Sequence, residues 1–89
     1  MTVLDDRKMF APLRRAHMIS PELHLVALLR RHDAGATAEL LTDDFAEANL
    51  VVGSRSSIVK RMGQLLDDLE QAGQVERIPD GRYRVIRGG

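Results

Sequence analysis

The sequence predicts a mainly α-helical α+β domain with three core helices, a C-terminal β-hairpin and an extra N-terminal helical segment. Its length of 89 residues suits one small domain. Apolar residues recur at helical spacing in several stretches, and an alternating polar–apolar run follows a turn motif near the C-terminus. We therefore expect an N-terminal extension over residues 1–19, a core domain over 20–87 and a tail over 88–89.

The first expected element is an amphipathic helical segment over residues 2–17. Pro12 lies inside its apolar pattern and is expected to kink or divide it. Two roles stay open for this segment: it packs on its own domain and covers a neighbouring helix, or it forms a homodimer. The apolar residues that would make the dimer contact are Val3, Leu4, Met9, Phe10 and Leu13.

Two helices are expected next. Ser20 and Pro21 predict the start of a helix that ends near His32, because serine is a favourable N-cap and proline is favoured at the first helical position. Apolar residues cover more than one face of this helix, so something beyond the main core is expected to cover it. Thr37 is the expected N-cap of the following helix, which ends near Asn49.

The clearest helix is predicted over residues 54–73. Ser54 can cap its start, and Gly73 suits a left-handed cap at its end. Gly63 lies inside the helix and costs about 1 kcal/mol relative to alanine, so either something approaches the backbone there or the helix tolerates the loss. One stripe of the helix carries its apolar residues, which are Ile58, Met62, Leu65, Leu66, Leu69 and Ala72.

A β-hairpin is predicted after this helix, over residues 74–87. The Pro-Asp-Gly sequence at 79–81 favours a tight turn. The alternation that follows predicts Tyr83 in the core and Arg82 and Arg84 together on the other face. An isolated hairpin is marginal in water, so we expect this one to pack on the helices.

Composition excludes several classes of protein. The chain has no cysteine, which removes disulfides and thiolate metal sites, and no apolar run approaches the ~18–20 residues that span a bilayer. The N-terminus is acidic where a signal peptide would be basic, so we expect a cytoplasmic protein. His24 and His32 are too far apart to share a metal, and no catalytic motif is present; we expect no cofactor, no metal site and no enzymatic activity.

The formal net charge is zero, from 13 basic and 13 acidic side chains, but the charges are unevenly distributed. Residues 53–64 contain three basic residues and no acidic one, and residues 77–89 contain four arginines against Asp80. Residues 33–48 contain five acidic residues and no basic one. A surface that binds an anion must therefore be local, and the acidic segment must point away from it.

The runs SRSSIVKRM (54–62), LEQAGQV (69–75) and PDGRYRV (79–85) resemble the winged helix-turn-helix superfamily of bacterial and phage regulators. The resemblance covers about residues 20–87. It implies that the 54–73 helix enters the major groove of DNA and that the hairpin, the wing, contacts the backbone or the minor groove. It also implies a homodimer, because small regulators of this superfamily commonly dimerise.

The expected function is that of a sequence-specific transcriptional regulator that binds double-stranded DNA. Arginine and glutamine can bond to base edges, whereas serine and lysine suit phosphates. Two alternatives stay open: a protein–protein interaction adaptor that docks through the acidic segment 33–48, and an accessory subunit that binds nucleic acid without sequence preference. The expected DNA-binding residues are Ser54, Arg55, Ser56, Ser57, Lys60, Arg61, Gln64, Arg82, Arg84 and Arg87.

Overall fold

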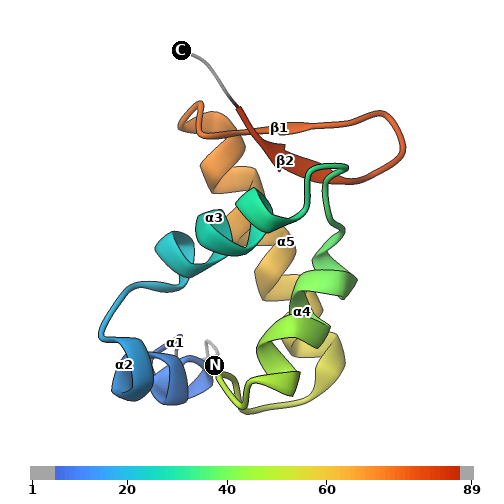
Figure 1. Ribbon diagram of the computed structural model, residues 1–89. Helices are drawn as coiled ribbons and strands as arrows, with labels where there is room; N and C mark the ends of the chain where they lie inside the picture. The colour runs from blue at the N-terminus through green and yellow to red at the C-terminus, as the bar shows by residue number, and fades with distance from the viewer. Residues whose placement is uncertain (1–5, 87–89) are drawn as a thin grey trace.

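The computed structural model describes residues 6–86 and confirms a mainly helical α+β chain (Figure 1). Three helices, α3, α4 and α5, form the body of the molecule, and an antiparallel two-stranded hairpin follows them. Two short helices precede them. The elements are α1 (Asp6–Met9), α2 (Ala11–His17), α3 (Pro21–Arg31), α4 (Ala38–Glu47), α5 (Arg55–Gln71), β1 (Val75–Arg77) and β2 (Tyr83–Val85).

The three predicted N-caps are confirmed. The hydroxyl of Ser20 accepts a hydrogen bond from the backbone N–H of Leu23 at 3.3 Å, and that of Thr37 accepts one from Leu40 at 3.1 Å. Ser54 caps α5 in the same way. Each hydroxyl satisfies a backbone donor that the first helical turn leaves without a partner.

The core lies where α3, α4 and α5 meet. Leu25 of α3, Leu41 and Phe45 of α4, and Met62 and Leu66 of α5 are fully buried there. α4 packs along α5, and α3 packs against both α5 and β2. Five of the six residues of the predicted apolar stripe, Ile58 to Leu69, therefore face inward, and the opposite face of α5 is exposed. The prediction is wrong for Ala72, which is exposed because it lies just after the end of the helix.

The hairpin packs on the helices as predicted. Tyr83 is 8% exposed, which confirms it as a core residue. Its hydroxyl donates a hydrogen bond to Asp67 Oδ1 of α5 at 2.9 Å. Burial and this hydrogen bond raise the pKa of Tyr83, because both favour the neutral phenol.

The segment between α3 and α4 pairs with the hairpin, which the sequence did not predict. Ala36 and Tyr83 exchange two backbone hydrogen bonds, at 2.9 and 2.8 Å. Gly35 has a φ of +89°, and a Cβ there would lie 2.9 Å from Ile78 Cδ1 and 3.0 Å from the carbonyl oxygen of Tyr83. Only glycine fits this backbone conformation at this close approach.

The N-terminal segment packs on its own domain. It is divided between α1 and α2 at Phe10, and Pro12 lies in the first turn of α2, so the predicted division is confirmed. The carbonyl of Met9 accepts a hydrogen bond from Val52 N–H at 3.0 Å, and Leu13 N–H donates one to the carbonyl of Leu50 at 3.2 Å. The segment is thereby fixed to residues 48–54, which connect α4 to α5.

Part of the second apolar face of α3 is exposed in the single chain, although Val26 and Leu28 pack against the core. Leu23 is 60% exposed, because α1 and α2 turn toward the connection that precedes α5. One contact between α2 and α3 is a pair of stacked rings, His17 and His24, whose centroids are 5.4 Å apart. Figure 1 shows α1, α2 and the 48–54 connection at one end of the molecule and the hairpin at the opposite end.

Candidate nucleic-acid interface

The exposed face of α5 carries a row of polar side chains over its first half. Ser56, Lys60 and Gln64 are four residues apart, so they lie one above another on the helix, and all three are exposed. Within the described part of the chain, Lys60 forms no ion pair. The guanidinium of Arg61 donates a hydrogen bond to Gln64 Oε1 at 3.0 Å, which holds the two side chains together.

The serines at the start of α5 have different environments. Ser54 Oγ accepts a hydrogen bond from Ser57 N–H at 3.3 Å and donates one to Ser57 Oγ at 2.8 Å. These two hydroxyls are therefore engaged in capping the helix. Ser56 is exposed beside them and is the serine best placed to meet a phosphate.

Arg55 connects the start of α5 to the acidic segment. Its guanidinium forms an ion pair with the carboxylate of Asp43 in α4, and both side chains are about half exposed. The expectation that the whole acidic segment points away from this region is therefore wrong for Asp43. The reason is the packing of α4 along α5, which brings Asp43 beside Arg55 in the first turn of α5.

The arginines of the hairpin are also paired with carboxylates. Arg82 Nε lies 3.3 Å from Asp80 Oδ2, and Arg84 Nε lies 2.5 Å from Glu76 Oε2. Exposed ion pairs of this kind contribute about 0–1 kcal/mol, so a phosphate can replace the carboxylate at small cost. Arg87, the other arginine expected in the interface, lies outside the described residues.

The expected site residues form two separate groups. One group lies on the first half of α5, and the other lies on the hairpin, at opposite ends of the molecule in Figure 1. α5 has 17 residues, which corresponds to a length of about 25 Å. Any nucleic acid that touches both groups must therefore run along the molecule.

A third basic region was missed by the sequence reasoning. Residues 7–31 contain six basic residues and one acidic residue, Glu22. A count of charges over this window would have found it. Lys8, Arg14 and Arg15 are exposed there, and none of the three makes an ion pair with another described residue.

The histidines form contacts within the protein. His24 packs edge-on against Phe45, with ring centroids 4.9 Å apart, and burial lowers its pKa, with smaller contributions from His17 and Arg31. His32 Nε2 lies 3.0 Å from Asp44 Oδ2. Over residues 6–86, no group of three or more potential metal ligands occurs.

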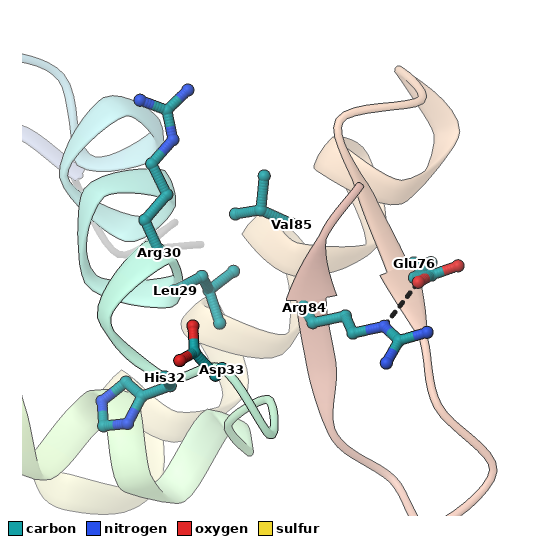
Figure 2. A pocket seen from close by; sticks show the side chains of 7 residues that line it. All are labelled: Leu29, Arg30, His32, Asp33, Glu76, Arg84 and Val85. Atoms are coloured by element: carbon teal, nitrogen blue, oxygen red, sulfur yellow. Dashed lines mark hydrogen bonds and ion pairs between the residues drawn. The ribbon is translucent and has the colours of Figure 1, made fainter. Parts of the chain in front are cut away.

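A small cavity lies between the end of α3 and the hairpin (Figure 2). Its volume is about 220 Å³, which is below the roughly 300 Å³ at which small-molecule sites begin. Figure 2 shows that Arg84 is turned toward Glu76 and that Arg30 points away from the other side chains. The lining residues are Leu29, Arg30, His32, Asp33, Glu76, Arg84 and Val85, and their charged groups do not converge on one point.

Three of the residues expected to make the dimer contact are buried inside the chain. Met9, Phe10 and Leu13 are at most 1% exposed and belong to the core of the chain itself. They offer a second copy no accessible area. Val3 and Leu4 lie outside the described residues.

Among the described helices, none is both long enough and apolar enough to cross a membrane. Compared with protein-family models, with curated proteins and with solved structures, the chain matches none of them.

Proposed function

We propose that this chain is a sequence-specific regulator that binds double-stranded DNA, with a winged helix-turn-helix architecture. The observation that carries the proposal is the exposed row of Ser56, Lys60 and Gln64 on α5, with Arg61 bonded to Gln64. An α-helix fits the major groove, and arginine and glutamine can bond to base edges there. Lysine and serine at the flanks suit phosphates.

The first half of α5 is the part that enters the groove. Over residues 53–64 the chain has three basic residues and no acidic one. Asp67, Asp68 and Glu70 follow in the second half, and their carboxylates would be repelled by phosphates. The change of charge along the helix therefore fixes which end approaches DNA.

The fold supports a fixed position for the hairpin as a wing. The backbone bonds between Ala36 and Tyr83 and the bond from Tyr83 to Asp67 tie β2 to two other parts of the domain. On binding, Arg82 and Arg84 exchange their carboxylate partners for phosphates of the backbone or the minor groove. About four to six neutralised phosphates per subunit give a slope of log affinity against log salt of roughly −4 to −5.

An interaction adaptor is the second candidate, and the surface of α4 favours it. Glu39, Asp43 and Glu47 lie on this helix with Leu40, whose side chain is 39% exposed. Acidic groups around an apolar residue suit a basic protein partner rather than DNA. This candidate requires α4, and the regulator requires α5, so substitutions separate them.

The test is fluorescence anisotropy of the full chain with labelled duplexes at low salt. Duplexes enriched by selection from a random library are compared with unselected ones. We expect the chain to bind selected sequences at least about tenfold more tightly than unselected ones. The double variant Lys60→Ala with Arg61→Ala should lower the affinity for selected sequences at least about tenfold, since a good base contact contributes about 1–3 kcal/mol.

The matched control is Gln71→Ala, at an exposed position in the last turn of the same helix, which should leave the affinity unchanged. Equal binding to all sequences would favour the accessory subunit instead. No binding of any duplex at low salt would exclude both nucleic-acid functions and leave the adaptor.

A further inference from the structure

We infer that α1 and α2 form a second phosphate-binding surface, which contacts the backbone of the same duplex that α5 reads; this inference rests on the proposed function. The surface consists of Lys8, Arg14 and Arg15. Neither the resemblance to the winged-helix superfamily nor the predicted interface includes it.

Lys8, Arg14 and Arg15 differ from the hairpin arginines in how their charges are paired. Lys8, Arg14 and Arg15 are exposed and have no carboxylate partner among residues 6–86. The described arginines of the hairpin each have a carboxylate partner. Arg77 Nη2 lies 2.7 Å from Asp67 Oδ1, and Arg82 and Arg84 are paired with Asp80 and Glu76. On α1 and α2 a phosphate therefore meets three cations that have no carboxylate partner among the described side chains, whereas on the hairpin it must displace a carboxylate.

α1 and α2 are held at the end of the molecule where α5 begins. The hydrogen bonds from Val52 to Met9 and from Leu13 to Leu50, at 3.0 and 3.2 Å, fix α1 and α2 to the connection that leads into Ser54. Figure 1 shows these helices at the same end of the molecule as the start of α5. That is the half of α5 that carries the basic residues and would enter the groove.

The phosphate backbone of DNA is the ligand that these three cations fit. The major groove is about 12 Å wide and has a phosphate backbone along each edge. Cations that flank the start of a helix in the groove therefore face one of these edges. Arginine binds phosphate with two parallel hydrogen bonds, and the flexible lysine adds a point charge. The ligand is thus the phosphate backbone, with no base recognition.

The experiment measures duplex affinity across a range of salt concentrations for the full chain and for Arg14→Gln with Arg15→Gln. Removing two phosphate contacts should reduce the magnitude of the salt slope by about 1.8 and weaken binding equally for selected and unselected sequences. Arg14→Lys with Arg15→Lys keeps the charge and should keep most of the slope. Thermal unfolding should be unchanged, because both side chains are exposed.

The matched control is Arg30→Gln with Arg31→Gln. It removes the same charge from two exposed arginines in the last turn of α3, close to the hairpin and far from the start of α5 in Figure 1. We expect this control variant to change the salt slope by less than half as much as Arg14→Gln with Arg15→Gln changes it. An equal effect of the two double variants would show that only total charge matters and would overturn the inference.

Other outcomes separate this inference from the proposed function. If the wild type binds DNA and loses affinity with Lys60→Ala and Arg61→Ala but not with the α2 variant, the inference fails and the regulator stands. If no duplex binds, the proposed function itself fails. Vesicles containing phosphatidylserine serve as a second probe: loss of vesicle binding by the α2 variant, with DNA binding intact, would assign the surface to an anionic membrane and contradict the inference.

Discussion

At the scale of single residues, Gly35 decides how the hairpin is attached. Its positive φ and its close approach to Ile78 and to the Tyr83 carbonyl leave no space for a side chain. Caps such as Ser20 and Thr37 could be predicted, because capping depends on local sequence. The role of Gly35 could not, because it depends on a contact with residues more than 40 positions away in the chain.

Replacing Gly35 with alanine should destabilise the fold by about 2–3 kcal/mol, since strain at a positive φ adds to a steric clash. Gly81→Ala is the control: its φ is +91°, but nothing lies within 4 Å of the added Cβ. It should cost about 1 kcal/mol through backbone strain alone. Urea unfolding followed by circular dichroism measures both, and equal losses would contradict the account of the contact.

The lowered pKa of His24 predicts a dependence of stability on pH. Its folded-state pKa lies below the ordinary value of 6.5, so the unfolded chain binds more protons as the pH falls below 6.5. Stability should therefore decrease on acidification in this range. His24→Gln should reduce the decrease in melting temperature between pH 7 and 5.

The control for this prediction is His17→Gln. It removes a smaller cause of the shift and leaves the burial of His24, which is the largest cause. The His17→Gln variant should retain most of the dependence of the melting temperature on pH. If His24→Gln left the dependence of the melting temperature on pH unchanged, another group would be responsible for it.

At the scale of elements, α5 is the part that the sequence predicted best. Its apolar stripe up to Leu69, its cap at Ser54 and its left-handed end near Gly73 all follow from local spacing and are present. The N-terminal segment was only partly predictable. Its division near Pro12 follows from the chemistry of proline, but which surface it covers depends on Leu50 and Val52, whose carbonyl and N–H groups are available only in the folded connection.

Gly63 tests whether the exposed face of α5 is free in the unbound chain. Nothing lies within 4 Å of a Cβ built there, so Gly63→Ala should stabilise the protein by about 0.5–1 kcal/mol through helix propensity. Gly73→Ala, at a φ of +79°, should instead destabilise the protein. Thermal unfolding measures both, and a destabilised Gly63→Ala would mean that the helix backbone is constrained there.

At the scale of the whole molecule, the zero net charge is the sum of opposed regions. The basic excesses over residues 7–31, 53–64 and 77–89 are balanced by the acidic excesses over residues 1–6, 33–48 and 65–76. Charge counts along the sequence located the regions 33–48, 53–64 and 77–89 but could not reveal the Arg55–Asp43 pair or the paired arginines of the hairpin. Charge pairing depends on which helices pack together, and that information appears only in the fold.

We propose that the end of the molecule formed by α1, α2 and the first half of α5 faces DNA. Chemical-shift mapping of the isotopically labelled full chain during titration with a short duplex tests it most directly. We expect the perturbed backbone amides to lie in residues 54–64, in α1 and α2, and in the hairpin around Arg82 and Arg84. Perturbations confined to α4, or none at low salt, would contradict the claim.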